Sequence, residues 1–344
     1  MKPPYRVPSM SEIRTLPWNG LTVASLFSGC GGSSLGYRMS GYRVAWASEF
    51  IDIAAETYRA NSSGTVVDTR DIRTVEVGDL LDACNLRPGE LDLLDGSPPC
   101  ASFSTSGSRE RDWGKTKAYS GTVQRTDDLF FEFARILRGV QPRAFVAENV
   151  RGLVVGAAKG YFLEILAALK DCGYAVRCRV LDAQWLGVPQ RRQRVIFIGL
   201  RQDLGQVPRH PRPLPYYYTV RDALDGLPPS AEADCDVSRY AIGRELKRMD
   251  AKQSDRYFSL IRADFNKPCP TITAQAGNPG AASVVHPVEC RKFSVAELKR
   301  LCAFPDDFTL LGDYQRQVER LGRSVPPVMM RHIADSVRTQ LTGV

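Results

Sequence analysis

Between residue 21 and about residue 200, the sequence alternates short apolar segments with segments of helical periodicity. The candidate strands are the apolar segments 21–27, 44–47, 91–94, 144–147 and 195–198. Apolar residues recur at i, i+3, i+4 and i+7 in two intervening segments: Phe130, Phe133, Ala134 and Leu137, then Phe162, Ile165, Leu166 and Leu169. Repeated alternation of this kind is typical of βα units. The sequence therefore predicts an α/β fold with a mostly parallel sheet.

The pattern changes after residue 200. The stretches "QVPRHPRPLPYYY" and "DGLPPS" concentrate proline, and no sustained period of either kind follows until about residue 290. We therefore predict two domains. A large domain would span residues 1–200 and be completed by 318–344, and a small domain would span 201–317.

Helical signals return near the C-terminus. Ser294 can cap a helix, because Glu297 stands three residues later, as a capping box requires. A last helix is predicted from the helical spacing of four apolar residues: Met330, Ile333, Ala334 and Val337.

Lys and Arg number 46 against 38 Asp and Glu, which gives a net charge of +8. This charge favours a polyanionic partner, although many proteins without such a partner are equally basic.

The nine cysteines are scattered without a C-x-x-C pair and the three histidines lie far apart, so we expect no metal site, disulfide framework or serine–histidine triad. No apolar segment approaches the roughly 18 residues that cross a bilayer, and the N-terminus lacks a signal-peptide core. We therefore expect a cytoplasmic, nucleoid-associated protein with no membrane partner.

The glycine-rich stretch "LFSGCGGSSLG" lies between a predicted strand and a predicted helix, where doubly wound folds bind nucleotides. It is not a dinucleotide fingerprint, because Ser34 stands where the last glycine is needed, and no Gly-Lys-Ser/Thr follows as in a P-loop. Glu49 ends the second predicted strand and can accept hydrogen bonds from ribose hydroxyls. Asp71 and Ile72 can hold an adenine edge, or Asp71 can simply cap a helix. These residues favour an adenosine-type ligand without a pyrophosphate, and a plain glycine turn is the alternative.

The stretch "LDGSPPCASFS" places two prolines directly before Cys100. Prolines fix φ and remove backbone donors, so a rigid loop holds this thiol at the carboxyl edge of the predicted sheet. A free cysteine is more often a small buried hydrophobe, but this setting favours a nucleophile. Glu148 follows the apolar strand "AFVA" at the same edge, where it can also cap a helix. Strand alternation aims Arg192 and Arg194 of "QRRQR" to one side, toward a phosphate or a base carbonyl.

Six stretches occur in the order found in one enzyme family: "FSGCGG", "GSPPCASFS", "ENV", "QRRQR", "ELKRLCAFPDDF" and "GRSVPP". The sequence resembles the DNA (cytosine-5) methyltransferases over roughly residues 21–338. The resemblance implies a Rossmann-like, S-adenosylmethionine-dependent methyltransferase fold with a smaller target-recognition domain, in which "PTIT" at 270–273 resembles the family's threonine-containing element. It also implies S-adenosylmethionine as cofactor and double-stranded DNA as partner of a monomer. A cognate restriction endonuclease would be a further partner in restriction-modification.

The resemblance assigns roles to particular residues. Cys100 would add to C6 of a flipped cytosine, so that C5 takes the methyl group, and loss of the C5 proton would expel the thiolate. Glu148 would contact N3 and the exocyclic amine, with a raised pKa if it is protonated, Arg194 would hold O2, and Arg192 would support it or a phosphate. The cofactor-contacting positions would be Phe27, Gly29, Gly31, Glu49, Asp71, Ile72, Arg323 and Ser324. Side chains of the types that contact base edges stand in the small domain at Arg262, Asn266, Gln275 and Asn278.

The sequence departs from the family at Arg323, where the motif usually reads Gly-Asn-Ser-Val-Pro-Pro. A guanidinium beside a sulfonium is unfavourable unless an anion compensates. One explanation is a nearby carboxylate or an outward-turned side chain. The other is that Arg323 pairs with the extra carboxylate of carboxy-S-adenosylmethionine, which would make the product a carboxymethyl base.

Two further functions fit the same residues. An RNA (tRNA) cytosine-5 methyltransferase would have the same catalytic residues, although a separate proline-rich domain favours duplex DNA. A non-catalytic DNA-binding relative would have kept the fold alone. The joint presence of Cys100, Glu148 and Arg194 favours catalysis.

Overall fold

A computed structural model describes residues 2–99, 117–119, 122–124, 128–155, 159–228, 235, 241–250, 260–278, 281 and 283–343. The chain forms two compact units, which we call the sheet unit and the small unit. The sheet unit comprises Leu16–Leu181, Gln193–Arg212 and Met330–Val344, and the small unit comprises Met1–Thr15, Asp182–Arg192 and Pro213–Met329. Assignment of catalysis and target recognition to separate domains stays a prediction.

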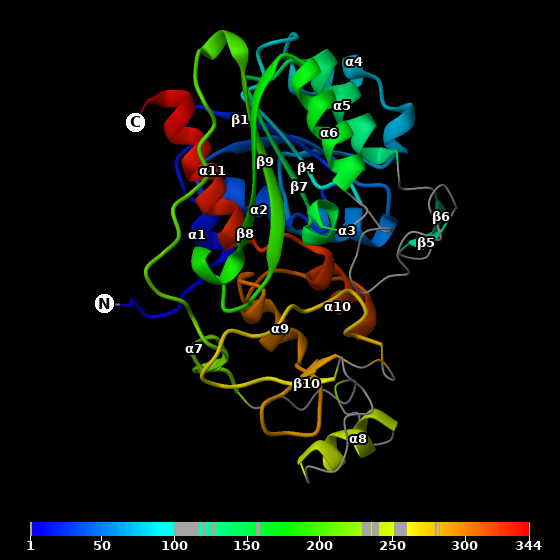
Figure 1. The fold of residues 1–344 in the computed structure, drawn as a ribbon, viewed down its shortest axis with the longest axis vertical. Helices are drawn as coiled ribbons and strands as arrows, with labels where there is room; N and C mark the ends of the chain where they lie inside the picture. The colour runs from blue at the N-terminus through cyan, green and yellow to red at the C-terminus, as the bar shows by residue number, and fades with distance from the viewer. Residues whose placement is uncertain are drawn as a thin grey trace. The chain divides into compact units, whose positions relative to one another are not determined.

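A seven-stranded sheet of order β3-β2-β1-β4-β7-β9-β8 forms the centre of the sheet unit (Figure 1). Its strands are β1 (Thr22–Leu26), β2 (Arg43–Ser48), β3 (Val66–Asp68), β4 (Leu93–Gly96), β7 (Ala144–Val150), β8 (Tyr174–Asp182) and β9 (Gln193–Arg201). β2 and β4 pair with β1 in parallel, β3 with β2 and β7 with β4 likewise, whereas β9 runs antiparallel to β7. The prediction of a mostly parallel α/β sheet is confirmed.

Helices cover the strands of this unit. They are α2 (Gly32–Met39), α3 (Asp52–Asn61), α4 (Val77–Cys84), α5 (Leu129–Val140), α6 (Lys159–Asp171) and α11 (Pro327–Thr342), with 3₁₀ turns Ile72–Thr74, Arg151–Val154 and Gln202–Leu204. A separate antiparallel pair is formed by β5 (Lys117–Tyr119) and β6 (Thr122–Gln124). The five predicted strands and the helices predicted from residues 130, 162 and 330 are all present, while β3 and β8 were not predicted.

Strand β4 shows how the two faces of the sheet are built. The aromatic ring of Phe133, on α5, packs where a side chain at Gly96 would stand, so Gly96 faces the core formed with α5 and α6. The adjacent Asp95 accepts a hydrogen bond from Tyr37 on α2. Successive residues of a strand point to opposite faces. Helices α5 and α2 therefore cover opposite faces of β4.

The strand order places the first connection at a switch point. β2 lies on one side of β1 and β4 on the other, so the chain leaves β1 and β4 in opposite directions along the sheet. Crevices at the carboxyl ends of strands where the order reverses are the usual ligand sites of open α/β sheets. The glycine-rich residues 27–31 follow β1 and lie at this point.

The small unit contains mostly short elements. They are α1 (Met10–Arg14), a 3₁₀ turn (Ala183–Leu186), α7 (Val220–Leu224), α8 (Ala241–Asp250), β10 (Ile261–Arg262), β11 (Val284–Val285), α9 (Val295–Leu301) and α10 (Tyr314–Arg323). β10 and β11 pair in parallel. α9 begins at the predicted capping box, because the Ser294 side chain accepts from the Glu297 amide and the Glu297 side chain accepts from the Ser294 amide.

None of the helices in the described ranges is long and apolar enough to cross a membrane. Within the same ranges no group of His, Cys, Asp and Glu side chains is arranged to hold a metal ion. The eight cysteines that the structure describes are all free thiols.

We expect the Gly199→Ala substitution to lower the free energy of unfolding by about 1–3 kcal/mol, measured by chemical denaturation. Gly199 pairs with Phe145 across β9 and β7, and a methyl group at Gly199 would overlap the Phe145 ring. Gly78→Ala, on α4, is the matched control, because its added methyl group would meet no atom of the described residues within 4 Å. An equal loss of stability in both variants would contradict this packing.

Candidate active site

Glu148 lies within β7, which continues past the apolar residues to Val150. The sequence placed Glu148 just after its strand, but the antiparallel ladder with β9 extends the strand through it and pairs Glu148 with Ile196. The side chain is buried, with 8% of Glu148 exposed. A buried carboxylate requires a charged or hydrogen-bonding partner.

Arg194 on β9 is that partner. Its Nε lies 2.6 Å from Glu148 Oε1, and its Nη1 donates to the Gln193 carbonyl at 2.8 Å. Burial lowers the pKa of Arg194 and the Glu148 carboxylate opposes this shift, but an arginine stays protonated throughout the physiological range. The structure thus brings two predicted site residues together as a buried, charge-assisted pair.

Asn149 connects β7 with the segment that precedes Cys100. Its buried side-chain amide donates to the Pro98 carbonyl at 3.2 Å, and its Oδ1 accepts from the Val150 amide. Cys100 itself lies outside the described residues. Asn149 stood in the quoted "ENV" stretch without a predicted role, and its position directly after Glu148 was the available signal.

A second buried carboxyl, which sequence reasoning missed, precedes the same segment. Asp95 lies near the carboxyl end of β4. Its carboxyl group accepts hydrogen bonds from the Ser25 hydroxyl at 2.9 Å and the Tyr37 hydroxyl at 3.1 Å. Complete burial raises the pKa of Asp95 to about 7, although both hydrogen bonds oppose the shift. The group that begins the segment leading to Cys100 therefore titrates near neutrality.

The glycine-rich connection has the backbone of a close ligand contact. Phe27, Gly29 and Gly31 all have positive φ, at 54°, 56° and 95°. A Cβ at Gly31 would come within 3.0 Å of the Tyr58 ring, whereas no atom of the described residues lies within 4 Å of one at Gly29. Gly31 is thus required by packing and by φ. At Gly29 the described part of the chain leaves the space beside the main chain open.

Glu49 is fixed beside that space. Its Oε2 accepts from the Gly29 amide at 2.7 Å and its Oε1 from the Ile51 amide at 2.8 Å. Each carboxylate oxygen can accept a second hydrogen bond. These two hydrogen bonds hold the Glu49 carboxylate in place beside Gly29.

The other predicted cofactor positions of the sheet unit are partly engaged. Asp71 caps the 3₁₀ turn by accepting from the Arg73 amide and pairs with the Arg73 guanidinium at 3.0 Å, as the simpler of its two interpretations expected. Ile72 is buried against the core.

The sheet unit also holds two buried hydroxyls with unmet hydrogen-bonding capacity. Ser34 Oγ and Tyr58 Oη have no hydrogen-bond partner in the part of the chain that the structure describes. Ser34 lies in the first turn of α2, and the Tyr58 ring touches Gly31. Buried polar atoms without partners mark places where a polar ligand or water completes the bonding. The connection after β1 thus fits an adenosine-type cofactor.

Arg192 belongs to the small unit and has a setting unlike that of Arg194. It is 1% exposed, and its guanidinium donates to the carbonyls of Ile272, Gly322 and Ser324 at 3.0, 2.8 and 2.9 Å. Strand alternation had placed both arginines on one side, whereas β9 begins only at Gln193. Arg192 therefore fixes the main chain on either side of Arg323.

Arg323 ends α10 beside an acidic side chain one turn earlier. Its Nε lies 2.9 Å from Glu319 Oε1, while Arg320 and Arg316 approach Glu319 Oε2 at 3.0 and 3.3 Å. An i,i+4 carboxylate is the nearby anion that the simpler explanation of Arg323 required. Ser324 caps the helix, and its hydroxyl donates to the Arg320 carbonyl.

Comparison with known proteins decides the family. Residues 21–339 match the family described as C-5 cytosine-specific DNA methylase. The chain belongs to this family. The methylase is 32% identical to the Type II methyltransferase M.SacI of Streptomyces achromogenes, over 93% of each chain. It is also 32% identical to the Type II methyltransferase M1.HphI of Haemophilus parahaemolyticus, over 92% of this chain and 86% of the relative.

Solved structures show the same fold. One, described as a DNA modification methyltransferase encoded within an E. coli prophage, superposes with a TM-score of 0.72 at 23% identity over 94% of this chain and 99% of that chain. A Spodoptera frugiperda DNMT2 variant gives a TM-score of 0.69 at 16% identity over 92% and 99%. The Rossmann-like fold expected from the sequence is confirmed. By its family, the methylase is a DNA cytosine-5 methyltransferase.

We expect the Asp95→Asn variant to differ from wild type in how stability depends on pH. With its pKa raised to about 7, folded Asp95 keeps a proton that the unfolded chain loses near pH 4. The stability contributed by the protonated acid is therefore complete below about pH 4 and is lost as pH rises to about 7. Relative to Asp95→Asn, the wild-type free energy of unfolding should fall by a few kcal/mol over this range.

Chemical denaturation at pH 4 to 8 makes the measurement. Asp82→Asn, at an exposed position of α4, is the control and should leave the pH dependence as in wild type. A constant difference between wild type and Asp95→Asn at every pH would show that Asp95 does not titrate in this range.

Proposed function

We propose that the methylase transfers a methyl group from S-adenosylmethionine to C5 of a cytosine flipped out of duplex DNA, with Cys100 as nucleophile. The observation that carries the proposal is the buried Glu148–Arg194 pair, next to Asn149, whose amide binds the carbonyl two residues before Cys100. A carboxylate on β7 and a guanidinium on the neighbouring strand β9 thus lie together, and Asn149, the residue after Glu148, holds the segment that leads to Cys100. This is the set that cytosine chemistry needs.

The chemistry explains each residue type. Cytosine C5 is too weak a nucleophile to attack a sulfonium methyl, but addition of the Cys100 thiolate to C6 moves an electron pair onto C5. The bound cofactor supplies the methyl group that C5 then attacks. Loss of the C5 proton returns the electron pair to the C5–C6 bond and expels the thiolate, so the enzyme is regenerated.

Glu148 and Arg194 would hold the base edge during these steps. The Glu148 carboxyl group would contact N3 and the exocyclic amine, and the Arg194 guanidinium would contact O2. Arg194 has five N–H donors, of which Nε faces Glu148, so one guanidinium can bind the carboxylate and the base oxygen together. The pair also keeps both charges compensated before the base arrives.

The cofactor would bind in the connection after β1. The open main chain at Gly29, the fixed carboxylate of Glu49 and the left-handed backbone of Phe27 and Gly31 support this placement. Glu49 would accept from the ribose hydroxyls, and Asp71 with Ile72 would border the adenine. In the small unit, Ser324 would bind the methionine end of the cofactor. Arg192 would fix the main chain at Ser324 by donating to the Ser324 carbonyl.

The substrate and setting follow from the same chemistry. C6 must be approached from one face of the ring, so the cytosine has to leave the base stack, at a cost of a few kcal/mol that new contacts offset. The net charge of +8 favours a DNA partner.

We propose that the chain acts as a monomer on DNA of the nucleoid. Its relatives are named Type II methyltransferases, which makes a cognate restriction endonuclease a further proposed partner.

We expect Cys100→Ser to abolish 5-methylcytosine formation, with a loss of at least about a thousandfold because a hydroxyl is not ionised at neutral pH. Liquid chromatography with mass spectrometry of nucleosides from duplex DNA and from tRNA makes the measurement. Cys178→Ser, at a half-buried thiol on β8, is the matched control and should retain wild-type activity. Modification of tRNA alone, or full activity of Cys100→Ser, would refute the proposal.

We expect Arg323→Asn to change the affinity for S-adenosylmethionine by less than about threefold, because Glu319 already compensates the Arg323 charge. Isothermal titration with S-adenosylmethionine and with carboxy-S-adenosylmethionine makes the measurement, and Arg331→Gln on α11 is the control. Because Arg323 already has an acidic partner, its charge does not require a carboxylated cofactor. A preference for the carboxylated cofactor that Arg323→Asn removes would overturn this reasoning.

A further inference from the structure

Lys292 is a buried cation that binds the main chain instead of an acid. The residue is 2% exposed, and its Nζ donates to the carbonyl of Ala276 at 2.7 Å and to that of Asn278. Among the described residues no carboxylate forms an ion pair with it. Burial accordingly lowers the pKa of Lys292 to about 8. Burial of a cation costs free energy, and here hydrogen bonds to main-chain carbonyls offset part of that cost.

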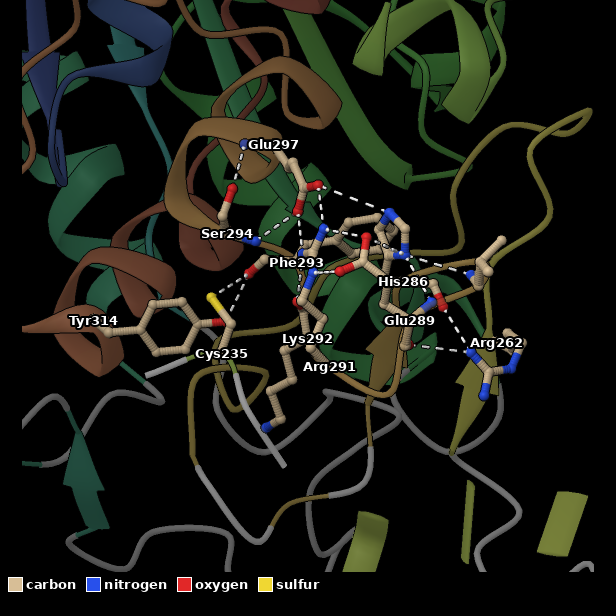
Figure 2. Close-up of polar contacts among 11 residues, drawn as sticks. Cys235, Arg262, His286, Glu289, Arg291, Lys292, Phe293, Ser294, Glu297 and Tyr314 are labelled. Carbon is tan, nitrogen blue, oxygen red and sulfur yellow. Dashed lines mark hydrogen bonds and ion pairs between the residues drawn. The ribbon is translucent and has the colours of Figure 1, made fainter. Parts of the chain in front are cut away.

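The residues on both sides of Lys292 are held in place by their own contacts (Figure 2). Arg291 makes a two-pronged ion pair with Glu297, with Nη1 and Nη2 at 2.7 and 2.8 Å from the two carboxylate oxygens. The Phe293 carbonyl accepts from the Tyr314 hydroxyl at 2.8 Å and from the Cys235 thiol. In Figure 2 the Lys292 side chain extends away from the Arg291–Glu297 pair. The contacts of Arg291 and Phe293 therefore fix the direction in which the Lys292 side chain leaves the main chain.

The segment that Lys292 binds is a tight turn. The Ala276 amide donates to the Thr273 carbonyl, and the Asn278 amide donates to the Gln275 carbonyl. The Asn278 side chain donates to the Gln275 side chain, so the two amides stand together. A Cβ at Gly277 would come within 2.9 Å of the Gln315 Cα, so the turn packs closely against α10.

The same segment is held at its other end. The Ile272 amide donates to the buried Gln190 side chain, and the Ile272 carbonyl accepts from Arg192. Gln275 is exposed between this attachment and the one at Lys292. Two buried side-chain attachments thus fix the ends of a turn whose middle presents an amide to solvent. Amide side chains are the groups that contact adenine edges in pairs of hydrogen bonds.

We infer that Lys292 is a positioning residue for target recognition, which holds the 273–278 turn so that Gln275 and Asn278 contact base edges of the DNA. The inference rests on the proposed function, because it assumes a duplex substrate. A buried charge is costlier than an apolar side chain of the same shape, so Lys292 acts on the geometry of the turn more than on overall stability.

The test compares sequence selectivity in wild type, Lys292→Met and Lys292→Gln. Each full-length protein selects duplexes from a randomised DNA library, and the bound DNA and the positions of 5-methylcytosine are sequenced separately. Lys267→Met is the matched control, because Lys267 lies in the same unit with 75% of its side chain exposed. Thermal unfolding confirms that each variant is folded, and Lys292→Gln replaces Lys292→Met if the latter is not.

We expect loss of the Lys292 ammonium to reduce discrimination at one or two base positions by roughly tenfold, the effect of losing one base contact. The kcat on the preferred duplex should stay within about threefold of wild type, and Lys267→Met should match wild type throughout. In a background of Gln275→Ala and Asn278→Ala, Lys292→Met should cause no further change, because the three residues act through one turn.

Unchanged selectivity in a folded Lys292 variant would overturn the inference, whatever happens to its stability or rate. An additive effect of Lys292→Met in the double-alanine background would overturn it as well. If wild type selects particular duplexes but forms no 5-methylcytosine, the proposed function fails while the binding profile still tests Lys292. If wild type selects no sequence at all, the inference fails.

Discussion

The antiparallel pairing of β9 with β7 is the constraint on which the candidate site depends. The ladder runs from Ala144 opposite Leu200 to Val150 opposite Arg194, and it extends β7 beyond its apolar part. Because of this extension Glu148 stays inside the strand, where burial leaves it in need of a charged partner. Arg194 meets it from the neighbouring strand, and Asn149 reaches the Pro98 carbonyl from the next position. One set of main-chain hydrogen bonds therefore places three polar side chains.

The small unit follows a different principle, in which buried cations bind carbonyl oxygens. Arg192 binds three carbonyls and Lys292 binds two, and both act on the segment around residues 270–278. Carbonyl groups of irregular segments lack the partners that helices and sheets supply. A unit with short elements needs such donors to keep one conformation. Two arginines only two residues apart thus have different partners, a carboxylate for Arg194 and main-chain carbonyls for Arg192.

Much of the fold was predictable because its signals are local. Apolar runs marked β1, β2, β4, β7 and β9, and the Ser294–Glu297 spacing marked the start of α9. The edge strand β8 was missed, because its exposed positions include Arg177 and Arg179 and no continuous apolar run remains. Asp95 was missed for another reason. Its partners Ser25 and Tyr37 are distant in the sequence, and only packing of α2 on the sheet makes it a buried acid.

The sequence by itself determined the class of fold, the order of the motifs and the family, since these depend on residue types at short spacings. The Arg323–Glu319 ion pair also has a local signal, because the acid stands four residues earlier on the same helix. The tertiary structure alone decided which buried cation serves which acceptor. Arg192 meets carbonyls 80 and 130 residues away, and Glu148 meets an arginine on another strand. Such pairs depend on how elements pack, which periodicity does not record.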